Sequence, residues 1–445
     1  MSKLNRSILE ESVLLASTIK WIIFSTFAGV AAGGTTSLFL NLLAYSTKEV
    51  SSWHHYYLLI PFALFLSSWF VTRFAPEAEG HGTEKVIEAV HKRNGKINLK
   101  VVPIKTLATL ITLTFGGSAG KEGPSAQIGA GTASFFANVL KLNKDDYRRF
   151  VICGISAGFA GVFGTPIAAA IFAAEVLYIG NFSYRVLLPA LISSYISFFI
   201  NKYFGANHFH YLIKIDNKND FQMFFYMIIF GIIIGLVALL FIKTLDFFEK
   251  WFKEKLPIYK PLKGIIGGIF LILIVIVTKS TDFIGLGTNV IDRALAGKEV
   301  TELSFLVKIF TTSVTLSSGG SGGILTPIFF VGSTLGNAWA QLIDGNLAMY
   351  SAIGMVALLA ASANTPLAAI IMAMELFGVQ VAIYASIASV ISYLVVGHHS
   401  VYPSQILTLP KTPSIDTDIN CEIRQIRHLK LANKPHILFR KHKFK

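Results

Sequence analysis

The chain carries its short glycine-rich motifs twice, in the same order, about 200 residues apart. Three motifs return in this way: GHGT at 80–83 as GLGT at 285–288, GGSAG at 116–120 as GGSGG at 319–323, and TPIAA at 165–169 as TPLAA at 365–369. One repeat alone would leave its inner face unburied, so the two halves are expected to fold as one unit. In an apolar chain, such a duplication indicates a membrane transport fold with its site where the halves meet.

The composition supports a membrane location. Hydrophobic residues make up 53% of the chain and charged residues only 14%, well below the roughly 25% that is typical of soluble domains. Trp21–Thr47, Phe221–Ile242 and Leu376–Gly397 carry no charge, and a bilayer crossing takes about 20 apolar residues in a helix. We therefore predict an all-α polytopic membrane protein with about fourteen to eighteen helical segments, several too short to span alone.

The charge distribution predicts the domains and the orientation. A polar stretch at 214–220 separates a first membrane repeat, 1–213, from a second, 214–409, and residues 410–445 form a short basic tail. Positive flanks normally stay in the cytoplasm, so we expect the tail to be cytoplasmic. The net charge of +14 is better explained by this membrane topology than by nucleic acid, and it favours anions over cations as cargo.

No cofactor or metal is predicted. Cys153 and Cys421 are the two cysteines; they do not suggest a disulfide framework, and no Cys/His cluster has metal-ligand spacing.

The glycine clusters predict helices that begin inside the membrane. Gly116–Gly123 and Gly319–Gly323 interrupt apolar runs and lead into Pro124 and Pro327, and proline suits the first positions of a helix. Broken helix at membrane depth is tolerated only where protein buries it or where it lines a cavity. Two helix starts that converge there present unpaired N–H groups and positive dipole ends, which together make an anion site. Close helix packing at glycine is the alternative.

Glu122 is the single residue that most strongly indicates a function. It lies between these glycines in apolar surroundings, where ionisable groups are costly and usually functional. The matching position in the second repeat is Leu325. A carboxylate at an anion site competes with the anion, and protonation would release it, so Glu122 is predicted to be a gate or a proton carrier. A structural carboxylate that caps the helix start is the alternative.

Other polar residues allow two interpretations each. Lys105 and Lys308 match across the repeats and either bias the pore toward anions or snorkel to the interface. His81 either donates a hydrogen bond to an anion or is an ordinary loop histidine. Glu175 and Glu375 also match; they either bond backbone near helix ends, which we expect, or act directly in transport.

A hydrolase is a competing class. The spacing Gly-x-Ser-x-Gly, typical of a nucleophile elbow, surrounds both Ser118 and Ser321. One active site needs one nucleophile, so its presence in both halves favours an architectural role over an intramembrane serine hydrolase. We do not expect an enzyme.

With GKEGP at 120–124 and GILTP at 323–327 beside GHGT at 80–83, the chain resembles the ClC family of chloride channels and transporters, almost throughout up to about Leu409. The resemblance implies an inverted-repeat fold with many tilted and broken helices. It also implies a homodimer in the lipid bilayer, with one pore in each subunit.

The resemblance also implies roles for individual residues. Glu122 would be the gate, Lys105 would bias the pore electrostatically, and the Tyr402 hydroxyl would bind the central ion. His81 and the backbone amides of four residues at the helix starts would face the anion: Lys121, Glu122, Ile324 and Leu325.

Three positions depart from the family pattern. His81 stands where serine is usual, and Leu325 stands where phenylalanine is common. Val176 stands where the proton exchangers carry an internal glutamate. The histidine affects the expected anion preference and pH response, and the valine weakens the expectation of tight proton coupling.

The first functional hypothesis is a voltage-gated, ClC-type chloride channel that passes chloride through a pathway gated by Glu122. The alternative is a proton-coupled exchanger of chloride or fluoride. In both, the chain is a multi-pass protein of the plasma or inner membrane, and the anion is a transported ligand.

Overall fold

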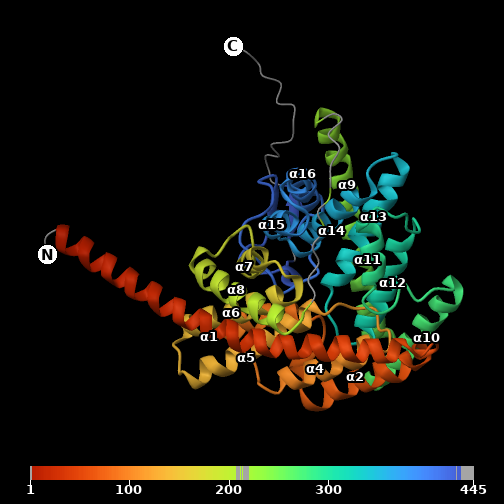
Figure 1. Cartoon of the computed structure of the whole chain (residues 1–445), viewed down its shortest axis with the longest axis horizontal. Helices are drawn as coiled ribbons and strands as arrows, with labels where there is room; N and C mark the ends of the chain where they lie inside the picture. Colours follow the sequence, from red (N-terminus) through yellow and green to blue (C-terminus); the bar gives the residue numbers. More distant parts are fainter. Residues whose placement is uncertain (1–2, 207–210, 212, 214–219, 427, 432–445) are drawn as a thin grey trace, which may run out of the picture.

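The described residues form a mostly helical fold (Figure 1). The computed structural model describes residues 3–206, 211, 213, 220–426 and 428–431. Within these residues the first half contains α1 (Lys3–Ser51), α2 (Ile60–Phe74), α3 (Thr83–Lys92), α4 (Val101–Thr114), α5 (Glu122–Val139), α6 (Lys144–Phe163), α7 (Pro166–Glu175) and α8 (Leu187–Tyr203). The second half contains α9 (Asp220–Lys250), α10 (Lys260–Thr278), α11 (Thr288–Leu295), α12 (Ser304–Ser317), α13 (Leu325–Leu342), α14 (Leu347–Ala363), α15 (Pro366–Phe377) and α16 (Val379–Val395).

Helix length separates two kinds of element. Among the described residues, five helices are long and apolar enough to cross a bilayer: Leu9–Ser51, Tyr56–Phe74, Tyr184–Tyr203, Phe221–Lys255 and Lys260–Thr278. Several others are apolar but only 10–17 residues long, too short to cross about 30 Å of hydrocarbon alone. The predicted mixture of full spans and partial helices is confirmed.

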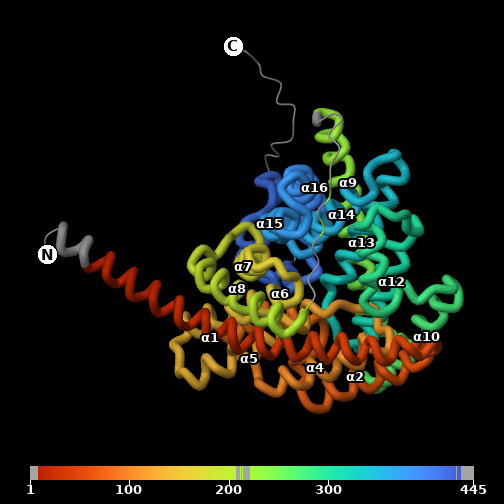
Figure 2. The backbone as a smooth tube through the Cα atoms, in the orientation of Figure 1, coloured from red at the N-terminus to blue at the C-terminus, as the bar shows by residue number. Residues whose placement is uncertain are grey.

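The two halves lie side by side, and equivalent helices pack in equivalent ways. In Figure 2 the helices of the first half run from red to yellow and those of the second from green to blue. A Cβ atom on Gly129 of α5 would overlap the backbone of Gly154 of α6, and Gly332 of α13 stands in the same relation to Gly354 of α14. Glycine at these positions lets the helix backbones touch, so the predicted packing role applies here, away from the glycine-rich breaks.

The end of the described chain departs from the all-helical expectation. The strands are β1 (Tyr178–Ile179), β2 (Ile406–Leu407), β3 (Ile415–Thr417), β4 (Cys421–Glu422) and β5 (Leu429–Leu431). β2 pairs with β1 and β4, and β3 pairs with β5. Because β1 follows α7, this small sheet attaches the tail to the first half. The sequence pattern missed these strands because each has only two or three residues.

Two sequence-based predictions fall partly outside the described residues. The polar boundary between the repeats is one, since residues 214–219 are not described. Most of the basic cluster of the tail, at 427 and 432–445, is the other.

Candidate functional site: where the broken helices cross

The two glycine-rich segments meet in the interior. The Gly120 N–H donates to the Gly323 carbonyl at 2.7 Å, and the Gly323 N–H donates to the Gly120 carbonyl at 2.6 Å. α5 begins two residues after the first glycine, at Glu122, and α13 begins two residues after the second, at Leu325. Two helix N-termini, with their unpaired N–H groups, therefore lie next to each other inside the protein, as the sequence predicted.

The predicted backbone donors lie at these helix starts. Lys121 is the N-cap residue of α5, and Ile324 is the N-cap residue of α13. Glu122 and Leu325 follow as the first helical residues, and both are buried. The structure thus brings together all four positions, and their contact with an anion stays a prediction.

The loop that carries His81 is held against the start of α5. Gly82 has a φ of +81°, and a Cβ atom on it would overlap the backbone of Gly123. A Cβ atom on Gly123 would in turn overlap the His81 carbonyl. Only glycine accommodates both the left-handed backbone and the close approach, and the result is that His81 lies beside the paired helix starts.

Glu122 bonds the other repeat. Thr326 donates its hydroxyl to Glu122 Oε1 at 2.5 Å and to Oε2 at 2.6 Å, and its N–H donates to Oε2 at 3.1 Å. The Glu122 side chain is nearly fully buried. The carboxylate therefore occupies donors at the positive end of α13, where negative charge is favoured. The carboxylate thus caps a helix of the second repeat, which fits the structural alternative, and its role as a gate or proton carrier stays a prediction.

A small cavity adjoins this carboxylate. Its volume is about 20 Å³, and its lining includes Glu122, Thr326, Phe329 and Phe377. A cavity of this size holds a single water-sized species. Its walls are otherwise mostly apolar, so a small ion in it would depend on the donors at the helix starts.

Three further polar atoms belong to the same neighbourhood. His81 Nδ1, Thr83 Oγ1 and Tyr402 Oη are buried. The Thr83 and Tyr402 hydroxyls interact with each other, and none of the three atoms has another hydrogen-bond partner among the described residues. The Tyr402 segment is tied to α3, because Ser404 bonds Glu84. Buried polar groups in native proteins are normally satisfied, so these atoms fit the donors of an ion site.

The matched lysines secure the loops of their own repeats. Lys105 Nζ donates to the Gly80 carbonyl at 2.6 Å, and Lys308 Nζ donates to the Gly285 carbonyl at 2.9 Å. Both side chains are fully buried, so the alternative that they snorkel to the membrane surface is wrong. The influence of Lys105 on the pore electrostatics stays a prediction.

The matched glutamates bond backbone near helix ends, as predicted, and each bonds the opposite repeat. Glu175 accepts from two N–H groups at the start of α15, at 3.1 and 2.9 Å. Glu375 accepts from two N–H groups at the start of α7, at 3.1 and 2.8 Å. Val176 contributes its carbonyl, which accepts from Gln405 Nε2 at 2.8 Å.

The two serines of the Gly-x-Ser-x-Gly motifs join the halves. The Ser118 hydroxyl bonds the Thr311 and Thr312 hydroxyls at 3.1 and 3.0 Å, and the Ser321 hydroxyl bonds that of Thr109 at 3.1 Å. A serine nucleophile needs a base within hydrogen-bond reach. The partners seen are threonine hydroxyls, so the hydrolase alternative gains no support.

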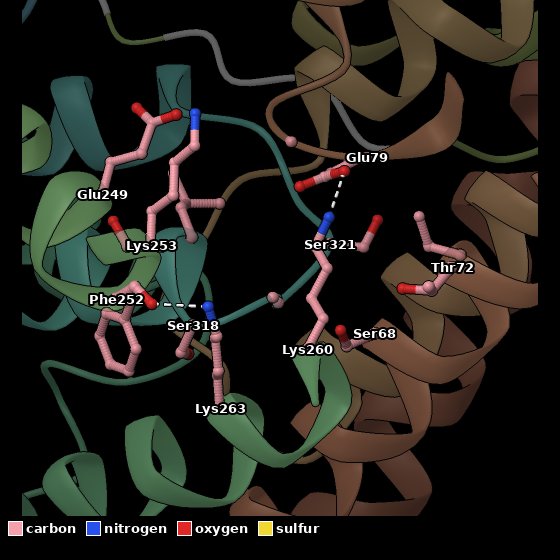
Figure 3. Close-up of a pocket in the computed structure, with 16 residues that line it drawn as sticks. Ser68, Thr72, Glu79, Glu249, Phe252, Lys253, Lys260, Lys263, Ser318 and Ser321 are labelled. Carbon is pink, nitrogen blue, oxygen red and sulfur yellow. Dashed lines mark hydrogen bonds and ion pairs between the residues drawn. The ribbon is translucent and has the colours of Figure 1, made fainter. Parts of the chain in front are cut away.

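A larger cavity, of about 400 Å³, opens beside the loop that carries His81 (Figure 3). It extends from Glu79 and Gly80 to the second glycine-rich segment at Ser318–Ser321. Lys260 forms an ion pair with Glu79, at 2.5 Å from Nζ to Oε2. Three lysines and two glutamates line it: Lys253, Lys260, Lys263, Glu79 and Glu249.

Sequence reasoning missed Thr326 and Glu84. Thr326 stands at the repeat position of Gly123, so a comparison of the repeats position by position would have found its additional hydroxyl. Glu84 directly follows the GHGT motif, and its partner, Ser404, lies 320 residues away in the chain.

Paired helix starts with an intervening carboxylate define a class of protein, the membrane proteins that bind an anion between two broken helices. The family model described as "Voltage gated chloride channel" matches residues 63–397. This is most of the chain, and the chain belongs to that family. Consistent with the apolar helices, it is an integral membrane protein.

Similar proteins include both channels and exchangers by name. The "Chloride/fluoride channel protein" of Pseudomonas syringae pv. tomato is 35% identical over 91% of this chain and 90% of that protein. The "H(+)/Cl(-) exchange transporter ClcA" of Salmonella arizonae is 28% identical over 78% of this chain and 77% of that protein. The solved structure of "a CLC-type fluoride/proton antiporter" has a TM-score of 0.83 and 28% identity, and the match covers 88% of this chain and 98% of that one.

Proposed function

We propose that the chain exchanges protons for a small anion across the membrane, with Glu122 as the group that carries the proton. The observation that carries the proposal is the bond between the Glu122 carboxylate and Thr326. An anion and the carboxylate compete for the same donors. Protonation removes the charge of Glu122 and with it most of the attraction to those donors. Proton uptake and anion entry are thereby linked at one residue.

Exchange replaces the passive channel as the leading hypothesis. A protein with a similar structure is described as a fluoride/proton antiporter, and a similar sequence is described as a proton/chloride exchange transporter. Val176 removes one carboxylate that exchangers of the family carry, but it leaves Glu122 in place. A Glu122-gated chloride channel is the second candidate, favoured by the description of the Pseudomonas relative.

We propose that fluoride is transported in preference to chloride. Fluoride is smaller and more basic than chloride, so it accepts shorter and stronger hydrogen bonds. The Thr326 hydroxyl already makes bonds of 2.5 and 2.6 Å to the carboxylate, at the short end of the range for O–H donors. The adjoining cavity of about 20 Å³ also favours the smaller ion.

Orientation and assembly complete the proposal. We place the basic tail on the cytoplasmic side of the plasma or inner membrane, since positive flanks are retained there. The cavity with Lys253, Lys260 and Lys263 then serves as a vestibule that concentrates anions by its charge. The homodimer implied by the resemblance stays a prediction.

The experiment is transport by the purified protein in liposomes, with fluoride or chloride on one side and simultaneous proton recording. A fluoride gradient should drive protons uphill in the opposite direction, and a chloride gradient should do so less effectively. Thr326→Val removes the hydroxyl at nearly constant volume and should reduce the preference for fluoride by roughly tenfold, equivalent to about 1.4 kcal/mol of lost hydrogen bonding. Dissipation of fluoride without proton movement would support the channel instead.

A further inference from the structure

We propose that Glu84 is a second proton-handling carboxylate, which passes protons between the water beside the tail and Glu122. The inference rests on the proposed function, because it assigns the route by which protons reach the carboxylate that competes with the anion. Glu84 lies in α3, one residue after Thr83 and three after His81.

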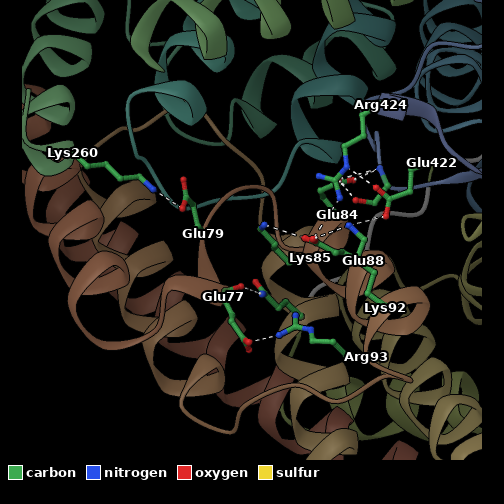
Figure 4. A network of polar contacts seen from close by, with 12 residues as sticks. Glu77, Glu79, Glu84, Lys85, Glu88, Lys92, Arg93, Lys260, Glu422 and Arg424 are labelled. Atoms are coloured by element: carbon green, nitrogen blue, oxygen red, sulfur yellow. Dashed lines mark hydrogen bonds and ion pairs between the residues drawn. The ribbon is translucent and has the colours of Figure 1, made fainter. Parts of the chain in front are cut away.

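The Glu84 carboxylate connects the start of α3, which follows His81 and Thr83, to the segment that contains Tyr402. It accepts from the Ser404 hydroxyl at 2.5 Å and from the Ser404 N–H at 3.1 Å. Ser404 lies two residues after Tyr402. Glu84 therefore links the start of α3 to the Tyr402 segment, and it lies near Arg424 and Glu422 (Figure 4).

Glu84 differs from the neighbouring acids in its partners. Glu88 forms ion pairs with Lys85 and Lys92, at 3.2 and 3.5 Å, and Glu422 binds Arg424 at 2.6 Å. In the described part of the chain, no ion pair includes Glu84. Its hydrogen bonds thus come from the neutral donors of Ser404, although it is partly buried. A carboxylate in this position binds a proton more readily than one that is paired with a cation.

The charged and titratable groups that act on Glu84 come from three elements. They are Lys85 on its own helix, Arg424 after β4, and the Tyr402 hydroxyl. Arg424 directs its guanidinium to Glu422 and Glu88. α3 is not among the candidate membrane spans. Burial raises the pKa of Glu84 to about 7, although the bonds from Ser404 and the charges of Arg424 and Lys85 oppose the rise, which suits an acid that gains and loses protons near neutral pH.

The second repeat has no equivalent acid. The matching residue is Asn289, which is exposed. Glu84 therefore joins Glu122 and His81 as a titratable residue that the first repeat alone contains. A purely architectural contact would be expected in both repeats, as seen for Glu175 and Glu375.

Both carboxylates act on one buried hydroxyl group, that of Tyr402. The Tyr402 hydroxyl also interacts with the buried hydroxyl of Thr83, the residue before Glu84. A proton from water binds Glu84, which is partly exposed, and is then released to Glu122. Glu84 returns to the carboxylate as Glu122 becomes the carboxylic acid, so the total charge of the pair is unchanged.

The test compares Glu84→Gln, Glu84→Asp and Glu88→Gln in liposomes under a fluoride gradient with simultaneous proton recording. Glutamine still accepts the Ser404 bonds through its amide oxygen, but it cannot take up and release a proton near neutral pH. Proton flux in Glu84→Gln should fall by on the order of 100-fold, as expected for loss of a positioned proton-transfer group, and the ratio of fluoride to protons moved should rise. Glu84→Asp should restore part of the proton flux. Glu88→Gln, one turn further along the same helix, should keep the ratio of the unmodified protein.

Two outcomes would overturn the inference, and they differ. If the unmodified protein couples fluoride to protons and Glu84→Gln keeps the same ratio, Glu84 only clamps the Tyr402 segment. That holds whether or not both fluxes fall together. If the unmodified protein moves no protons under a fluoride gradient, the proposed function fails, and the proton role of Glu84 fails with it.

Discussion

The two repeats share their framework and differ in their titratable residues. Both use a glycine bridge at the crossing, a buried lysine that holds the neighbouring loop, and a glutamate that bonds the opposite helix start. Only the first repeat has an acid at the start of its broken helix and a histidine in its loop, where the second has Leu325 and Leu286. The duplicated residues thus form a symmetric framework, and the titratable residues of the site lie in the first repeat.

We expect the largest effect on transport from substitution of Glu122, the acid that the second repeat lacks. Glu122→Gln should abolish the pH dependence of anion flux and reduce coupled proton flux by on the order of 100-fold, because the amide cannot carry a proton. Liposome flux across a range of pH measures both. Glu299→Gln, at an exposed loop position, is the control and should behave like the unmodified protein. A pH response that survives in Glu122→Gln would remove the functional difference between the repeats.

A smaller effect is expected at the glycines of the crossing. Gly123→Ala places a methyl group on the His81 carbonyl and should lower stability by about 1–3 kcal/mol through overpacking, with loss of transport. Gly34→Ala is the matched control, since no described atom beyond its chain neighbours and its own helix backbone lies within 4 Å of its Cβ position. Thermal unfolding in detergent compares the two. Equal melting temperatures would show that the loop and helix are not in contact.

The shared glutamates should respond alike. Glu175→Gln and Glu375→Gln each lose a charge-assisted pair of bonds to backbone N–H groups, at an expected cost of about 2 kcal/mol. Both variants should melt at similar temperatures, below that of the unmodified protein. A large loss in one variant with none in the other would contradict the structural equivalence of the repeats.

Much of the fold and part of the site followed from the sequence, because short backbone motifs determine them. Glycine and proline at the breaks predicted the helix starts, and an acid in apolar surroundings marked Glu122. The partners of that acid were not predictable by the same means. Thr326 lies 204 residues from Glu122 in the chain, and only folding brings them together.

The lysines and the tail illustrate a second limit. Hydropathy alone does not distinguish a lysine that reaches the interface from one that binds carbonyls within the protein, so Lys105 and Lys308 stayed ambiguous until their contacts were known. The short strands that attach the tail depend on pairing with the first half, and a run of two or three residues carries no periodic signal.

In the proposed mechanism, anion entry and proton uptake are linked at Glu122. The most direct measurement is proton movement into or out of liposomes that contain the purified protein, started by a fluoride gradient and with no initial pH difference. We expect uphill proton movement opposite to fluoride in the unmodified protein and none in Glu122→Gln. Rapid fluoride flux with no proton movement in the unmodified protein would contradict it.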